Sequence, residues 1–187
     1  MGAHQNVARR LISVGEYHKM GDAGVFGETD RIELIEGELI QMAPIGGPHM
    51  QPVNLLTRLL VQQVGEEGVV SPQNPISLPP DSEPEPDLVV LRPEWLYRTE
   101  VPSAQDVLLV VEISVTTGDY DRDVKIPLYA KHAIPEVWIF EPTTGTVSLY
   151  REPTRNGYQR FLTPDKNDTI TPLLLSHVQL KLRDVWR

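Results

Sequence analysis

The sequence has no cysteine among its 187 residues, which excludes disulfide bonds and thiolate-ligated metal sites. It also lacks any apolar run near the roughly 20 residues that a membrane-spanning helix requires, and no signal peptide is visible at its start. We therefore expect a soluble cytoplasmic protein that is not attached to a membrane.

Positive charge is scarce, because 17 Lys and Arg residues are set against 26 Asp and Glu residues, for a formal net charge of −9. Extensive non-specific nucleic-acid binding relies on Lys and Arg side chains that neutralise phosphates, so this balance counts against it. A local basic strip, or an acidic site whose potential is changed by a bound cation, remains compatible with the composition.

The rest of the composition is that of an ordinary globular protein. Hydrophobic residues make up 40% and charged residues 23% of the chain, which argues against disorder. The length suits one domain with a full core, and the sequence contains no repeat or low-complexity segment. We expect residues 1–187 to form a single α/β domain.

Turn and capping signals predict the first elements. The capping-box pattern that begins at Ser13 predicts a short helix over residues 14–20. Glu36-Gly37 is a two-residue hairpin signal between short apolar segments at residues 31–35 and 38–42. Apolar residues at helical spacing predict the main core helix over residues 49–65.

The later part of the chain alternates short apolar segments with turn residues. This pattern predicts strands at residues 69–70, 76–78, 88–91, 108–114, 137–140, 146–150, 158–162 and 179–182. A helical turn is expected at residues 94–97, and a helix at residues 121–132, whose first turns Pro127 confines.

A carboxylate interrupts the most apolar of these strands. Residues 108–114 (LLVVEIS) have the composition of a strand buried on both faces, yet they include Glu112. Because an unpartnered, ionised carboxylate is costly to bury, Glu112 should meet a cation, a metal ion or a proton. Asp87 lies in a similar position, after Pro86 and at the start of the strand at residues 88–91.

Asp87, Glu112 and Lys125 supply the groups needed to hydrolyse a phosphodiester, if they converge. Two carboxylates can hold a magnesium ion that retains several waters. The metal would activate the phosphate and a water, and the lysine would stabilise developing charge. In the structural alternative, Asp87 caps a turn and Glu112 pairs with a buried Arg or Lys. Lys125 is then a solvated helix residue, and the residues alone leave both interpretations open.

Several motifs are shared with a known family. They are Pro86-Asp87 before an apolar strand, Val111-Glu112-Ile113-Ser114, the segment from Tyr120 to Ala130, the segment from Ile134 to Trp138, the hairpin at residues 33–39, and Pro48-His49. In these motifs the chain resembles the Uma-type family of restriction-endonuclease-like proteins, which is assigned to the PD-(D/E)XK nuclease superfamily. The resemblance implies a mixed β-sheet flanked by helices, with extra N- and C-terminal β-hairpins.

The resemblance also implies a role for each motif residue. Asp87 matches the first acidic position and Glu112 the second, both as metal ligands, and the backbone carbonyl of Ile113 is a further metal ligand by analogy. The superfamily often places a lysine two residues after the second acidic position, where this chain has Ser114. In this family the lysine lies on the following helix, and Lys125 matches it.

Three auxiliary residues follow from the same resemblance. Glu33 would either touch the metal shell or pair with Arg31 or Arg58. His49 would either bind metal or phosphate, or have a structural or surface role. Tyr129 is expected to pack or hydrogen-bond behind the lysine.

The sequence thus favours a DNA endonuclease that depends on Mg²⁺, with Mn²⁺ as an alternative ion and a homodimer as a compatible state. Two other hypotheses stay open. One is a nuclease fold that serves as a binding or regulatory module, which the acidic charge favours. The other is a hydrolase of a small phosphorylated molecule, which would not need a basic DNA-binding surface.

Overall fold

The structure is a computed structural model, and it describes residues 8–27, 29–44, 46–115 and 117–186. These residues form two compact units. The first contains the N-terminal part of the chain up to Ala43 together with Ser77–Pro84, and the second contains Pro44–Ile76 and the chain from Glu85 onwards. The expected single domain over residues 1–187 stays a prediction.

The first unit contains one helix and one hairpin, namely α1 (Val14–Asp22), β1 (Ile32–Ile35) and β2 (Glu38–Gln41). Ser13 caps α1 through reciprocal hydrogen bonds with Glu16, which form the predicted capping box. The hairpin turns at Glu36 and Gly37, which both have positive φ, as the favoured two-residue hairpin turns require. The predicted helix and hairpin are confirmed.

Residues 77–84 belong to the same unit and pair with β1, which forms an antiparallel bridge with Glu83. The strand predicted at residues 76–78 is wrong. Leu78 forms only an isolated bridge with Ser82, because the two prolines that follow Leu78 have no N–H to donate to a longer ladder.

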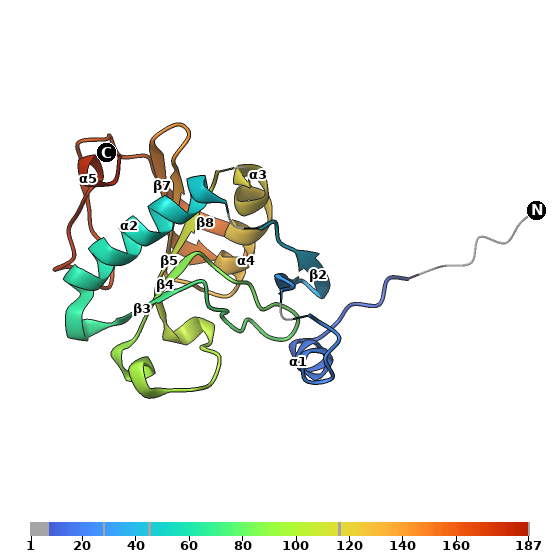
Figure 1. Cartoon of the computed structure of the whole chain (residues 1–187). Helices are drawn as coiled ribbons and strands as arrows, with labels where there is room; N and C mark the ends of the chain where they lie inside the picture. The colour runs from blue at the N-terminus through green and yellow to red at the C-terminus, as the bar shows by residue number, and fades with distance from the viewer. Residues whose placement is uncertain (1–7, 28, 45, 116, 187) are drawn as a thin grey trace, which may run out of the picture. The chain divides into compact units, whose positions relative to one another are not determined.

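The second unit is built on a six-stranded mixed sheet with the strand order β3-β4-β5-β6-β7-β8 (Figure 1). Its strands are β3 (Val69–Pro72), β4 (Leu88–Leu91), β5 (Val107–Ile113), β6 (Glu136–Glu141), β7 (Thr146–Thr154) and β8 (Gly157–Leu162). Neighbouring strands are antiparallel except for β5 and β6, which run parallel. A parallel pair needs a crossover, and here the crossover is helical.

The helical elements of this unit include a π-helical turn inside the crossover. They are α2 (Gly47–Val64), η1 (Gly65–Glu67), η2 (Pro93–Tyr97), η3 (Ala104–Asp106), α3 (Gly118–Tyr120), the π turn η4 (Asp121–Lys125), α4 (Ile126–Lys131) and α5 (Leu182–Val185). The helix predicted at residues 121–132 is therefore present, but it starts earlier and contains a π turn that the sequence analysis did not anticipate.

Helices flank the sheet, as the fold class predicted. α2 contacts β3 and β5 and lies along the sheet in Figure 1, while α4 contacts β7 and β8. Near the end of the chain, β9 (Thr169–Ile170) and β10 (Leu180–Lys181) pair as a separate antiparallel sheet. No helix among the residues that the structure describes has the length and apolar character needed to cross a membrane.

The whole of β5 is buried, and its side chains alternate between the two faces of the sheet. Leu109, Val111 and Ile113 belong to the hydrophobic cluster that includes the buried residues of α2. Glu112 lies between two of these residues in sequence, so its side chain points to the opposite face. On that face the carboxylate must find polar partners.

Candidate active site

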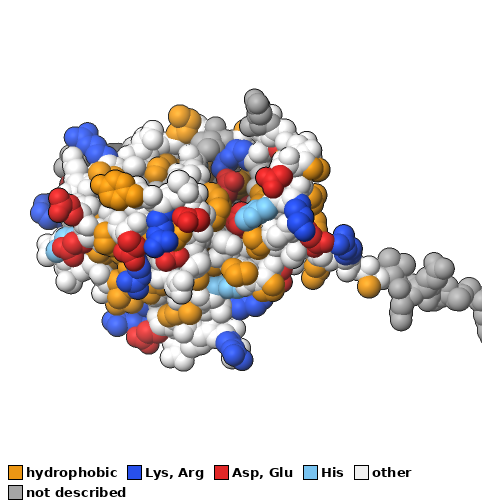
Figure 2. Space-filling model, turned by 90° about the horizontal axis from the view of Figure 1, so that it is seen from below, with side chains coloured by type: hydrophobic (Ala, Val, Ile, Leu, Met, Phe, Trp, Pro, Cys, Tyr) orange, Lys and Arg blue, Asp and Glu red, His pale blue; other side chains and the backbone are white. Residues whose placement is uncertain are grey.

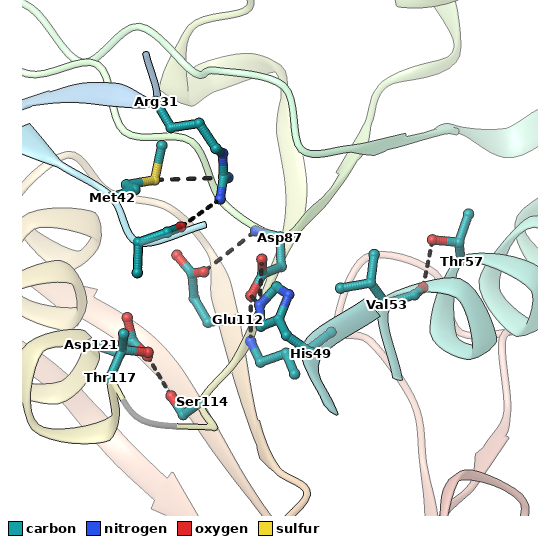
Figure 3. A network of polar contacts seen from close by, with 12 residues as sticks. Arg31, Met42, His49, Val53, Thr57, Asp87, Glu112, Ser114, Thr117 and Asp121 are labelled. Atoms are coloured by element: carbon teal, nitrogen blue, oxygen red, sulfur yellow. Dashed lines mark hydrogen bonds and ion pairs between the residues drawn. The ribbon is translucent and has the colours of Figure 1, made fainter. Parts of the chain in front are cut away.

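Asp87 and Glu112 meet because β4 and β5 run antiparallel. Leu88 is paired with Val111, so one further step of the register places Asp87 beside Glu112. The Asp87 N–H donates to Glu112 Oε2 over 3.4 Å, as the dashed line in Figure 3 shows. The Ile113 N–H in turn donates to Asp87 Oδ2 over 2.7 Å. The start of β4 and the end of β5 thus bring Asp87 and Glu112 together, each carboxylate accepting a hydrogen bond from the backbone of the other segment.

The crossover helix brings Lys125 and Tyr129 to the other oxygen of the same carboxylate. The two residues are four positions apart and share one helical face. The Tyr129 hydroxyl donates to Glu112 Oε1 over 2.6 Å, and Lys125 Nζ lies 3.4 Å from that oxygen. The Lys125 side chain is only 7% exposed, so it does not lie in solvent on the outer face of its helix.

Burial raises the pKa of Glu112 to about 8, because a carboxylate that loses its hydration favours the protonated form. The Lys125 ammonium lowers this pKa, whereas the charges of Asp87 and Asp121 raise it further. The Tyr129 hydrogen bond lowers it. Without a bound cation the cluster is therefore short of positive charge, and a divalent ion would relieve the repulsion between its carboxylates.

The available ligands suit a magnesium ion that keeps several waters better than a metal ion that is enclosed entirely by protein ligands. Within the part of the chain that the structure describes, no group of three or more His, Asp or Glu side chains is placed to hold a metal ion. A cation at Asp87 and Glu112 would be held by two carboxylates and would keep several waters, as Mg²⁺ usually does. The Ile113 carbonyl stays a predicted further ligand.

His49 lies in the first turn of α2 and contacts Asp87. Its Nε2 is 3.0 Å from Oδ2 and 3.0 Å from Oδ1 of the carboxylate, and Figure 3 shows the ring and the carboxylate facing each other. His49 therefore orients Asp87, together with the Ile113 N–H. Its contact with metal or phosphate stays a prediction.

Asp121 is a third buried carboxylate of this region, which the sequence analysis did not select. It is 4% exposed and accepts hydrogen bonds from the hydroxyls of Ser114 and Thr117, shown in Figure 3. The four-residue spacing of Thr117 and Asp121 was an available signal, because it puts both residues on one helical face.

Glu33 belongs to the other compact unit. It lies on β1 and is buried, and it is not among the residues that the second unit brings together. Its contact with the metal shell stays a prediction.

Comparisons with known proteins agree with this fold. The sequence profile of the Uma2 family, described as "Putative restriction endonuclease", matches residues 14–183. Among solved structures, the chain is similar to "a putative nuclease belonging to DUF820" from Anabaena variabilis ATCC 29413. The TM-score is 0.71 at 20% identity, over 94% of this chain and 97% of that one. At this identity the likeness shows the fold alone. No curated protein matches the chain.

Proposed function

The chain belongs to the Uma2 family of nuclease-like proteins, and we propose that it is a metal-dependent DNA endonuclease. The observation that carries the proposal is the environment of Glu112. Its buried carboxylate accepts a hydrogen bond from the backbone N–H of Asp87 and lies beside the Lys125 ammonium, and the charge of Asp87 acts on it. Two carboxylates and a lysine are the side chains that metal-assisted phosphodiester hydrolysis needs.

The two oxygens of Glu112 have separate tasks in this proposal. Oε2 lies on the side of Asp87, whose charge acts on Glu112, and the two carboxylates would hold Mg²⁺ or Mn²⁺. Oε1 accepts the Tyr129 hydrogen bond and lies beside Lys125, which fixes the orientation of the carboxylate. When bound, the cation would polarise the phosphate and lower the pKa of a coordinated water.

Lys125 would act on the phosphate. Its ammonium lies 3.4 Å from Glu112 Oε1 and is held in a nearly dry environment. A fixed positive charge in such an environment stabilises the negative charge that develops on phosphate oxygens in the transition state. His49 would keep Asp87 oriented during the reaction.

A second candidate is a nuclease fold that binds a partner or metal without hydrolysis. The formal net charge of −9 favours it. On the face in Figure 2, the Lys and Arg side chains are interspersed with Asp and Glu side chains, which is a poor surface for non-specific contact with phosphates. Metal binding without turnover would identify this candidate.

Cleavage of plasmid and single-stranded DNA with Mg²⁺, with Mn²⁺ and with a chelator tests the proposal. The parent should cleave only with a divalent ion, and Glu112→Gln and Lys125→Ala should each lower the rate by about 10²–10³-fold. Asp119→Asn removes a fully exposed charge from the same crossover and should leave the rate unchanged.

Three results would contradict the proposal. Absence of cleavage with either ion, while the metal still binds, would favour the non-hydrolysing candidate. Cleavage by Glu112→Gln at the parent rate would remove this site from the reaction. Faster hydrolysis of bis(p-nitrophenyl) phosphate than of DNA would favour a small phosphorylated substrate.

A further inference from the structure

The end of β5 and the crossover helix are joined by two successive side-chain contacts. Glu112 and Ser114 are two residues apart, so both side chains point to the same side of the sheet. Asp121, Lys125 and Tyr129 follow at four-residue intervals on the helix. Glu112 contacts Lys125 and Tyr129, and Ser114 contacts Asp121. The second contact lies outside the reaction proposed above.

Asp121 is tied to the segment after β5 through its side chain and to Thr117 through its backbone. The hydroxyls of Ser114 and Thr117 both donate to Asp121 Oδ2, the latter over 2.8 Å. The Asp121 N–H donates to the Thr117 carbonyl over 2.9 Å. Ser114 is itself fixed to β6, because its N–H donates to the Phe140 carbonyl over 2.8 Å. We call the side-chain contacts of Ser114, Thr117 and Asp121 the Asp121 clasp.

The clasp holds the first residue of the π turn, and Lys125 is the last. The turn closes with a hydrogen bond from the Ile126 N–H to the Asp121 carbonyl, five residues back. A π turn holds more residues than an α-helical turn, and such turns are frequent at functional sites. The wider turn changes the direction in which the side chains after its first residue point around the helix axis. The direction of Lys125 therefore depends on where the turn begins.

We infer that Asp121, with Ser114 and Thr117, is a positioning residue that aims Lys125 at Glu112. The inference rests on the proposed function, because it explains how the lysine of that site is held. Ser114 and Asp121 are each 4% exposed, so their hydrogen bond is buried and shielded from competition by water, whereas Thr117 is exposed. Asp121 acts through Lys125 and touches no substrate.

Four single variants separate positioning from a general loss of structure. Asp121→Ala and Ser114→Ala each break the clasp by removing a different side chain. If one of these variants does not fold, the other can still be tested. Asp121→Asn keeps an oxygen that accepts both hydroxyl hydrogen bonds. Asp123→Ala is the matched control, because it removes an exposed carboxylate from the same π turn.

The first readout is DNA cleavage. Asp121→Ala should lower kcat by about 10²-fold, the size expected when a reacting group is displaced by about 1 Å, and should leave KM nearly unchanged. Asp121→Asn should recover most of this loss, and Asp123→Ala should match the parent. Adding Asp121→Ala to Lys125→Ala should cause no further loss, because Asp121 acts through Lys125.

The second readout needs no activity. The Lys125 ammonium is nearly buried, so an acylating reagent should modify it more slowly than the exposed Lys166 and Lys181, as followed by peptide mass spectrometry. Asp121→Ala and Ser114→Ala should bring Lys125 close to the rate of the exposed lysines. Asp123→Ala should not change it.

The two readouts distinguish the two proposals. If the parent cleaves no DNA but the clasp variants expose Lys125, the proposed function fails and the positioning inference stands. If the parent cleaves DNA and both clasp variants leave Lys125 protected, the positioning inference is overturned and the nuclease proposal stands. A loss in Asp121→Ala that adds fully to that of Lys125→Ala would also overturn it.

Discussion

Glu112 and Glu136 are both buried glutamates on neighbouring strands of one sheet, but their partners differ. Glu136, the first residue of β6, is 0% exposed and accepts three hydrogen bonds. Arg151 Nε and Trp138 Nε1 each donate to Oε1 over 2.7 Å, and the Leu173 N–H donates to Oε2 over 2.6 Å. A guanidinium and two further donors thus complete the environment of this carboxylate.

Glu112 is equally buried, but its environment contains more negative than positive charge. Lys125 lies 3.4 Å away, while Asp87 and Asp121 both act to raise the pKa of Glu112, which burial brings to about 8. Burial of a carboxylate therefore does not mark a site by itself. A carboxylate whose pKa stays raised despite a neighbouring lysine keeps affinity for a further cation, and this distinguishes Glu112 as a functional candidate.

We expect the largest effect on stability from the loss of the ion pair between Glu136 and Arg151. Glu136→Gln leaves the largely buried Arg151 guanidinium without a counter-charge, which should cost about 3–5 kcal/mol of unfolding free energy. Glu112→Gln should not destabilise the cation-free protein at pH 8, because it removes the cost of burying an ionised carboxylate, which outweighs the attraction between Glu112 and Lys125. Urea unfolding of both variants measures this. Equal losses would mean that the two glutamates are both structural.

A divalent cation should stabilise the protein through Glu112 and Asp87. At 100 times its dissociation constant, Mg²⁺ should raise the unfolding free energy by about 2.7 kcal/mol, because it binds the folded state. The response should vanish in Asp87→Asn/Glu112→Gln and persist in Lys125→Ala. Thermal melts with and without Mg²⁺ measure this. A parent whose melting temperature ignores saturating Mg²⁺ and Mn²⁺ would contradict it.

The pH dependence of stability should also come from Glu112. Its pKa is raised from 4.5 to about 8 in the folded protein, so between these values the folded state binds more protons than the unfolded state. The cation-free unfolding free energy should thus fall as pH rises, by up to about 1.4 kcal/mol per pH unit relative to Glu112→Gln. The contribution is complete below pH 4.5 and lost above about pH 8. Parallel pH curves for the two proteins would contradict this.

Local signals in the sequence were enough for part of the fold. The capping box at Ser13, the hairpin turn at Glu36-Gly37 and the apolar run around Glu112 each act over a few residues, and each element formed as predicted. The segment at residues 76–78 also looked apolar, but its flanking prolines limit backbone pairing to single bridges. The two-residue strand β9 was too short to leave a periodic pattern.

Prediction of the candidate site required knowledge of long-range strand pairing, which local sequence signals do not give. Asp87 and Glu112 were recognisable as carboxylates at strand ends, but their meeting depends on the register of β4 against β5. The pairing of Glu136 with Arg151 likewise follows from the β6–β7 register. The π turn left no signal in the sequence, and Asp121 was not selected although its spacing from Thr117 and Lys125 was visible there.

The most direct test of the account is calorimetric titration of Mn²⁺ at pH 7 in two buffers with different ionisation enthalpies. A Glu112 whose pKa is about 8 is largely protonated at that pH, so metal binding should release a proton. We expect one site in the parent and in Lys125→Ala, with heat that depends on the buffer, and no site in Glu112→Gln. Binding that is unchanged in Glu112→Gln, or no binding by the parent, would contradict the claim that Glu112 and Asp87 hold the metal.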